Sequence, residues 1–198
     1  MALRHLLFVV TVFYFAFAIV TAEENKENNQ PNIVPRSEWG AYKPRSPNNK
    51  LQTLPPNYVI ISHTASTVCL TKDKCIKHVR NIQDLHVKQL GWNDIGYNFL
   101  VGGDGNVYEG RGWDAEGAHT KGYNAKSIGI AFIGEFTGKT PTQAQVDAAK
   151  QLLELGLAEK KLAANYKLLG QNQVKATQSP GTKVYEIIKT WDHWAESP

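Results

Sequence analysis

Tyr58-Val59-Ile60-Ile61-Ser62 is the stretch that decides the fold of this chain. β-branched and aromatic residues follow one another here without polar alternation, so we expect a strand that is buried on both faces. A helix is expected after it, from residue 72 to residue 89, because apolar residues return at three- and four-residue spacing until Gly91 ends the pattern. A buried strand followed by a covering helix predicts an α/β sheet.

The rest of the chain repeats this alternation of strands and helices. Further strands are predicted at residues 97–101, 106–109, 127–133 and 166–169, and further helices from Thr140-Pro141 onward and from 182 to 191. The inner face of the first helix is expected to hold Ile76, Val79, Ile82 or Gln83, Leu85 or His86, and Leu90. The predicted fold class is therefore α/β, a single domain with a central mixed, mostly parallel β-sheet covered by helices. A ligand site is expected over the strand ends.

The N-terminal residues predict a secreted protein. Residues 1–22 combine a short polar start, an apolar run and small residues near a cleavage point, which is the pattern of a signal peptide. The apolar run is short for a membrane span, so an uncleaved anchor is the less favoured alternative. Residues 23–32 are expected to form a flexible leader, and residues 33–198 the folded domain.

Cys69 and Cys75 are the two cysteines of the chain. An oxidising compartment favours a disulfide between them. A free or metal-bound pair is the weaker alternative, because no further ligands stand nearby at zinc-site spacing. The formal net charge is +4 without a dense block of basic residues, so the composition does not predict a nucleic-acid partner.

His63 follows the buried strand and is expected at its carboxyl end. A lone histidine in such a place is more often a hydrogen-bonded structural group than a ligand-binding one. Further polar groups are expected on the same rim: Thr64, His86, Tyr97, His119 and Asn124. Six such side chains together predict a cleft.

Several ordered segments resemble the peptidoglycan recognition protein family, which includes N-acetylmuramoyl-L-alanine amidases. The resemblance runs roughly from Pro35 to Trp194, through residues 36–41, 62–65, 69–75, 94–99, 105–113, 117–119, 128–132 and 179–181. The chain looks most like the short, secreted insect members. The resemblance implies a mixed sheet with helices and a groove on one face.

The resemblance also places three zinc-ligand positions at Ser62, Gln171 and Ser179, where amidase members hold His, His and Cys. Hydroxyl and neutral amide groups are poor zinc ligands beside imidazole and thiolate. No metal, no cofactor and no amidase activity are therefore expected. Tyr97 and Thr177 match the assisting positions of the family and are expected to remain as hydrogen-bonding groups. A serine hydrolase built on His63 is not favoured, because no Gly-x-Ser-x-Gly motif surrounds either serine.

Positions 91, 92 and 111 are implied to read the third residue of the stem peptide. Gly91, Trp92 and Arg111 are the combination associated with binders of diaminopimelate, whose extra carboxylate suits a guanidinium. Alternatively, Gly91 caps a helix, Trp92 fills core and Arg111 is solvated. The three zinc-ligand replacements make the chain similar to family members that sense lysine-type walls and start Toll signalling. Recognition of both peptide types is therefore the compromise interpretation.

The function expected from the sequence is that of a secreted haemolymph protein that recognises bacterial peptidoglycan. Binding is expected to promote assembly with other secreted recognition proteins and with serine proteases of an immune cascade. Neither a nucleic acid nor a membrane is expected as a partner. The alternatives are a zinc amidase that uses substitute ligands and a directly bactericidal wall-binding protein.

Overall fold

The structure is a computed structural model that describes residues 30–198. The predicted signal peptide and most of the predicted leader lie outside the described residues. Residues Pro31–Pro198 form one compact unit. Within the described part of the chain, no helix is both long and apolar enough to cross a membrane.

A six-stranded sheet forms the centre of this unit, in the order β1-β4-β3-β5-β2-β6. The strands are β1 Ile33–Val34, β2 Tyr58–His63, β3 Phe99–Val101, β4 Val107–Glu109, β5 Ser127–Phe132 and β6 Lys167–Gly170. All neighbouring strands pair in parallel except β3 and β4, which form an antiparallel hairpin. The predicted mixed, mostly parallel sheet is confirmed.

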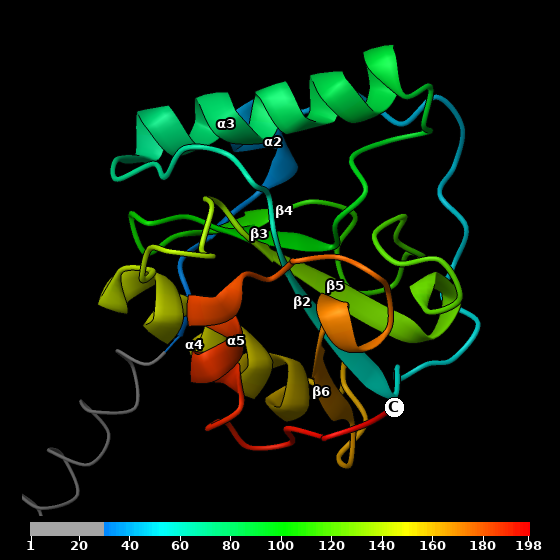
Figure 1. The fold of residues 1–198 in the computed structure, drawn as a ribbon. Helices are drawn as coiled ribbons and strands as arrows, with labels where there is room; N and C mark the ends of the chain where they lie inside the picture. Colours follow the sequence, from blue (N-terminus) through cyan, green and yellow to red (C-terminus); the bar gives the residue numbers. More distant parts are fainter. Residues whose placement is uncertain (1–29) are drawn as a thin grey trace, which may run out of the picture. The chain divides into compact units, whose positions relative to one another are not determined.

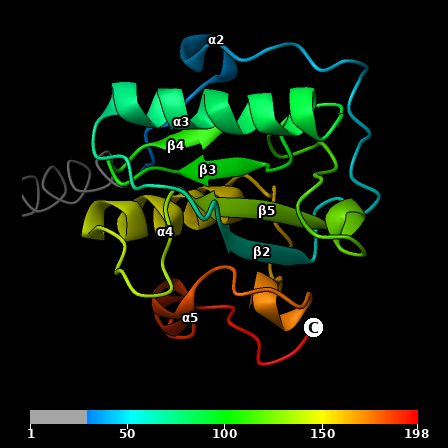
Figure 2. The same cartoon turned by 45° about the horizontal axis from the view of Figure 1, so that its top comes forward.

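Helices cover both faces of this sheet. They are α2 Arg36–Trp39, α3 Lys72–Asp84, α4 Gln143–Ala158 and α5 Thr182–Ile188. A π-helix, Leu85–Gln89, continues α3, and two 3-10 turns occupy Asn124–Lys126 and Gln171–Gln173. Figures 1 and 2 show α2 and α3 over one face of the sheet and α4 and α5 over the other.

Each face of the sheet has its own core of buried apolar side chains. Val59 and Ile61 of β2 belong to the larger core, together with residues of α4 and α5. Leu100 of β3 and Ala131 of β5 belong to the smaller core, with residues of α2 and α3. β2 is almost entirely buried because it lies between β5 and β6, as its apolar run predicts.

The start of α4 differs from the prediction, which placed it at Thr140-Pro141. The helix begins at Gln143, and the capping residue is Thr142. The Thr142 hydroxyl accepts a hydrogen bond from the backbone N–H of Gln145 at 3.1 Å, which satisfies one of the amides left unpaired at a helix start.

The prediction that Leu90 lies on the inner face of the first helix is wrong. Residues 85–89 form a π-helix, which adds a residue to the turn and rotates the side chains that follow. Leu85 and Leu90 are therefore 41% and 51% exposed, whereas His86 is buried. Leu90 donates its backbone N–H to the carbonyl of Leu85 at 3.0 Å.

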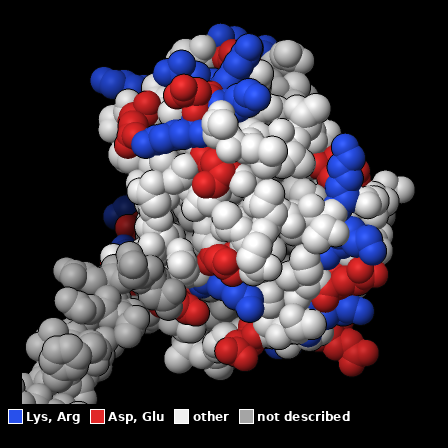
Figure 3. Space-filling view, turned by 90° about the vertical axis from the view of Figure 1, so that its left-hand side faces the viewer, with Lys and Arg blue, Asp and Glu red and all other residues white. Residues whose placement is uncertain are grey.

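Positive and negative side chains are interspersed on the described surface. Figure 3 shows Lys and Arg side chains beside Asp and Glu at the level of α2 and α3, and few charges in the middle of that face. Lys72 pairs with Glu38 between these helices, and Lys88 pairs with Asp84 at 2.7 Å. Such mixing is typical of a solvated helix face.

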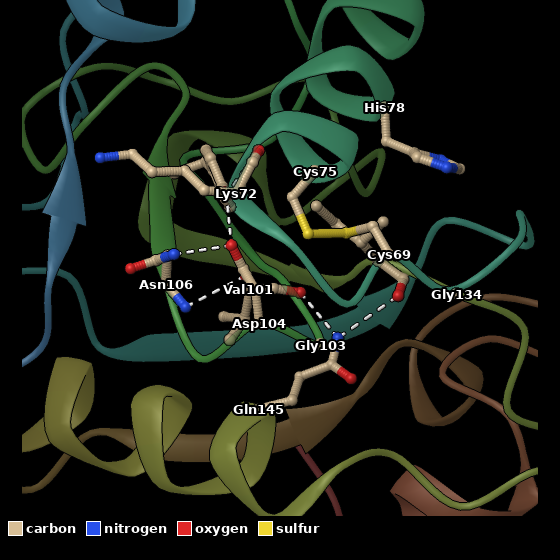
Figure 4. The surroundings of a disulfide bond; sticks show 12 residues. Cys69, Lys72, Cys75, His78, Val101, Gly103, Asp104, Asn106, Gly134 and Gln145 are labelled. Atoms are coloured by element: carbon tan, nitrogen blue, oxygen red, sulfur yellow. Dashed lines mark hydrogen bonds between the residues drawn. A yellow bond between two sulfur atoms is a disulfide. The ribbon is translucent and has the colours of Figure 1, made fainter.

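The predicted disulfide between Cys69 and Cys75 is confirmed. It joins the loop after β2 to the first turn of α3, and both cysteines are fully buried. Figure 4 shows it close to the turn that contains Gly103 and Asp104. A Cβ atom at Gly103 would lie 2.6 Å from the carbonyl oxygen of Cys69, so this turn packs tightly against the disulfide loop.

Replacing both Cys69 and Cys75 by serine is expected to lower the free energy of unfolding by about 2 kcal/mol, because the closed loop is short. Urea unfolding of the variant and of the wild type measures the difference. Adding a reductant is the control, since it should destabilise the wild type alone. Equal unfolding midpoints for the two oxidised proteins would show that the disulfide contributes nothing.

Candidate functional site

A cavity of about 250 Å³ lies where β2 and β6 end. Because these strands are parallel neighbours, their carboxyl ends lie at the same edge of the sheet. We refer to this cavity as the groove. Its lining consists of His63, Ala65, His86, Trp92, Gly96, Tyr97, Ala118, His119, Gln171, Lys175, Thr177 and Ser179.

His63, the last residue of β2, is held on both its backbone and its ring. Its backbone N–H donates to the hydroxyl of Ser179 at 3.0 Å, and its Nδ1 accepts from the backbone N–H of Phe136 at 3.3 Å. Burial lowers the pKa of His63, so the ring is neutral at pH 7 and carries its proton on Nε2. This N–H is a hydrogen-bond donor at the groove.

The π-helix places His86 in the groove wall. Its Nδ1 accepts from the backbone N–H of Gly96 at 3.0 Å, and its ring stacks on Trp92 with centroids 4.5 Å apart. Burial lowers the pKa of His86 to about 4. Burial also raises the pKa of Tyr97, whose ring is tilted against His86, to about 12. Both groups are therefore neutral at pH 7.

His119 is buried between two glycines. A Cβ atom at Gly117 or Gly129 would lie 2.4 Å or 2.3 Å from its ring. Its Nδ1 contacts the hydroxyl of Thr120 at 3.1 Å, whereas its buried Nε2 has no hydrogen-bond partner among residues 30–198. Burial lowers the pKa of His119 to about 3. An unpaired buried nitrogen costs free energy, and a ligand that bonds to it would recover that cost.

Comparisons with known proteins identify the family of this chain. The model of the N-acetylmuramoyl-L-alanine amidase family matches residues 52–182. Peptidoglycan-recognition protein SC2 of Drosophila simulans is 48% identical over 162 residues, which cover 82% of this chain and 87% of that protein. The chain belongs to the peptidoglycan recognition protein family. Peptidoglycan recognition protein 1 of Rattus norvegicus is 47% identical over 165 residues, 83% of this chain and 89% of that protein.

Solved structures of the family share this fold. The complex of peptidoglycan recognition proteins LCa and LCx with tracheal cytotoxin contains a chain that is 51% identical, with a TM-score of 0.81, covering 83% of this chain and 98% of that one. Human PGRP-IBETAC, solved with glycosamyl muramyl pentapeptide, is 44% identical with a TM-score of 0.80, covering 84% of this chain and 99% of that one.

The amidase activity of the family implies a zinc ion, and the side chains at the implied ligand positions do not fit one. The hydroxyl of Ser62 donates to the carbonyl of Ile130 at 3.4 Å, and the hydroxyl of Ser179 accepts from His63. The amide of Gln171 donates to the carbonyl of His119 at 2.8 Å and to the Thr120 hydroxyl at 3.2 Å. Each position holds a neutral group already committed to an internal hydrogen bond, whereas zinc sites use imidazole, thiolate or carboxylate.

Six of the residues expected to bind peptidoglycan line the groove, namely His63, His86, Trp92, Tyr97, His119 and Thr177. The other four lie outside its lining. The hydroxyl of Thr64 contacts Ser66 at 2.8 Å, and the side chain of Asn124 accepts from the backbone N–H of Thr120 at 2.7 Å. Gly91 adopts a φ of 71° directly after the π-helix, as expected of a residue that ends a helix.

Arg111 is not the solvated side chain of the alternative interpretation. Its Nε donates to the carbonyl of Ile95 at 2.7 Å, and its Nη1 donates to the carbonyl of Glu116 at 2.8 Å. Within residues 30–198 it forms no salt bridge. Its charge lowers the pKa of His86 and of His119 further, after the larger effect of burial. A half-buried cation therefore lies near two neutral histidines of the groove but outside its lining, where it borders a separate cavity.

Four lining residues were not predicted from the sequence: Ala65, Gly96, Ala118 and Lys175. Gly96 leaves room for the ring of Trp92, since a Cβ atom there would lie 2.7 Å from it. Lys175 lies between Gln171 and Thr177 in the sequence, and this position could have indicated that it lines the groove.

The neutral histidines predict how stability depends on pH. In the unfolded chain they take up protons below pH 6.5, whereas the folded chain resists this until about pH 4 at His86 and pH 3 at His119. The contribution of these histidines to the free energy of unfolding is therefore fully present above pH 7. It is lost as the pH falls, by about 2–4 kcal/mol between pH 7 and pH 5. Urea unfolding at several pH values measures this slope.

The variant His119→Gln, which cannot take up the proton, is the control for the pH dependence. It should lose about half of the slope between pH 7 and pH 5, because His86 still contributes. An unchanged slope would mean that His119 is not the group that titrates.

Proposed function

We propose that this chain is a secreted recognition protein that binds the muramyl stem peptide of bacterial peptidoglycan in its groove without hydrolysing it. The observation that carries the proposal is the contrast between the implied metal-ligand positions and the wall of the groove. Ser62, Gln171 and Ser179 occupy the implied metal-ligand positions with neutral groups bonded inside the protein. The hydrogen-bonding wall formed by His63, His86, Tyr97, His119 and Thr177 is present.

The neutral wall suits a peptide ligand. His63 offers an N–H donor, His119 has a buried nitrogen without a partner among the described residues, and Tyr97 keeps its hydroxyl proton. Amide groups of a peptide both donate and accept hydrogen bonds, so they match such a wall. The related proteins solved with tracheal cytotoxin or with glycosamyl muramyl pentapeptide support a ligand of this class.

The diaminopimelate type is the favoured stem peptide. Arg111 is a half-buried cation that forms no salt bridge with a carboxylate of the described chain, and Trp92, which lines the groove, stacks on the His86 ring. A carboxylate on the third residue of the ligand would give Arg111 a charge-assisted partner. Recognition of lysine-type peptides in addition is the alternative that a binding titration distinguishes.

The biological consequence proposed is activation of an immune serine-protease cascade that leads to Toll signalling, after assembly with other secreted recognition proteins in haemolymph. Clustering on a wall polymer would increase avidity without a stable dimer in solution. Direct killing of bacteria without any host factor would support the bactericidal alternative instead.

Metal analysis combined with wall digestion tests the absence of amidase activity. The purified chain, dialysed against zinc, is expected to hold far less than one zinc ion per molecule and to release no stem peptide from peptidoglycan. An amidase-competent relative is the positive control for the digestion. Stoichiometric zinc together with released stem peptide would establish the alternative, an amidase with substitute ligands.

A further inference from the structure

Among residues 30–198, Lys175 is the only lysine or arginine in the lining of the groove. The lining contains no carboxylate, and its histidines and its tyrosine are neutral at pH 7. Glu135, which acts electrostatically on His63, is outside the lining and accepts from the backbone N–H of Thr137 at 2.7 Å. The groove therefore combines neutral walls with one exposed cation at its mouth.

Lys175 lies at the end of the groove where an amidase would hold its metal. Its backbone N–H donates to the carbonyl of Gln171 at 3.0 Å, which places it one turn after that position. The polar groups of Ser62, Gln171 and Ser179 are engaged with the protein itself. An anionic group of a ligand at this end therefore has Lys175 as its available charged partner.

The order of the ligand along the groove follows from the proposed function, on which this inference rests. An N-acetylmuramoyl-L-alanine amidase cuts the amide that joins the muramyl group to the first stem residue, so that amide belongs at positions 62, 171 and 179. The third stem residue is assigned to positions 91, 92 and 111. The second residue is separated from that amide by the first residue alone, so it lies toward the end of the groove that holds Lys175. In peptidoglycan this residue is a glutamate linked through its γ-carboxyl, and its α-carboxyl is either free or amidated.

We infer that Lys175 is a specificity-determining residue that pairs with the free α-carboxylate of the second stem residue. The ammonium group of a lysine is a mobile point charge with three donors, which suits a carboxylate at an open groove mouth. The pair is exposed, so its contribution is modest and decreases with ionic strength. The groove thereby distinguishes free from amidated stem peptides independently of the third residue.

Two synthetic probes test this inference: muramyl tripeptides with diaminopimelate that differ only in a free or an amidated α-carboxyl on the second residue. The wild type is expected to bind the free form about two- to fivefold more tightly at low salt. Lys175→Met should weaken the free form by that factor and leave the amidated form unchanged. Lys175→Glu should reverse the preference. Because Lys175 is exposed, these variants are expected to fold normally.

Lys74→Met is the matched control, since it removes the same charge from an exposed residue of α3 outside the groove lining and should leave both affinities unchanged. Equal wild-type affinity for the two probes, or equal weakening of both by Lys175→Met, would overturn the assignment of Lys175. Failure of the wild type to bind either probe would instead refute the proposed function.

Discussion

The triple variant Ser62→His, Gln171→His, Ser179→Cys is expected to bind one zinc ion per chain with a dissociation constant of about 1 µM or below, a gain of about 8 kcal/mol. Two imidazoles and one thiolate form a ligand set that zinc accepts, with a further position open. Gln171 and Ser179 line the groove, and Ser62 is buried directly before His63; the three positions lie near the ends of β2 and β6 and before α5. Metal analysis after dialysis, followed by competition with a chelator, measures the gain.

Without zinc the same variant should be less stable than the wild type. It loses the bond from Gln171 to the His119 carbonyl and the bond from His63 to the Ser179 hydroxyl. Each lost bond that leaves a buried group unpaired costs about 1–3 kcal/mol. Adding zinc should restore stability, because a ligand that binds only the folded state stabilises it.

The single variant Ser179→Cys is the control for zinc binding, because one thiolate does not form a site. Stoichiometric zinc in the wild type, or a folded triple variant that takes up none, would contradict the assignment of positions 62, 171 and 179.

Arg111→Ala is expected to weaken binding of a diaminopimelate fragment by about 1.5–3 kcal/mol, roughly tenfold to a hundredfold, and to spare a lysine-type fragment. The guanidinium is the half-buried cation behind His86 and His119, and the described chain supplies no salt-bridge partner for it. A carboxylate on the third stem residue is the partner whose loss the experiment detects. Calorimetric titration with both fragments measures the difference.

Arg111 also donates to the carbonyls of Ile95 and Glu116, so its removal can disturb the backbone near the groove. The lysine-type fragment reports that disturbance, because it needs the same groove but no carboxylate partner. Arg111→Lys keeps the charge and loses the planar fork, so it should give an intermediate affinity. Equal losses for both fragments would show that Arg111 supports the backbone and does not read the third residue.

Sequence patterns predicted the elements that depend on local or strongly periodic signals. β2 was predictable because its apolar run requires burial on both faces, and the sheet type followed from the alternation of strands and helices. The disulfide followed from two cysteines in a chain with a secretory pattern. The start of α4 was misplaced by a Thr-Pro pair two residues before the true cap, Thr142.

The π-helix at 85–89 was not predictable, because distant residues hold it. Arg45 donates to the carbonyl of Val87 at 2.5 Å and to that of Gly91 at 3.3 Å, across more than forty residues of sequence. The same turn decides that His86 faces the groove while Leu85 and Leu90 face solvent. The apolar periodicity was compatible with either Leu85 or His86 as the inward residue and did not distinguish between them.

The environment of Arg111 could not be predicted from sequence patterns either. Its two carbonyl partners depend on how the segments around Ile95 and Glu116 fold against the hairpin of β3 and β4. Asp94, fully buried in a salt bridge with Arg36 at 3.0 Å, anchors the first of these segments. Tertiary packing therefore sets whether this arginine is solvated or held behind the groove.

In the proposed function, the groove binds a muramyl stem peptide and leaves it intact. The decisive measurement is a calorimetric titration of residues 23–198 with a diaminopimelate-type muramyl peptide, followed by mass analysis of the recovered ligand. We expect saturable binding of one ligand per chain, stronger than for the lysine-type peptide, and recovery of uncut ligand. No saturable binding of either peptide, or recovery of a ligand cut at the muramyl amide, would contradict it.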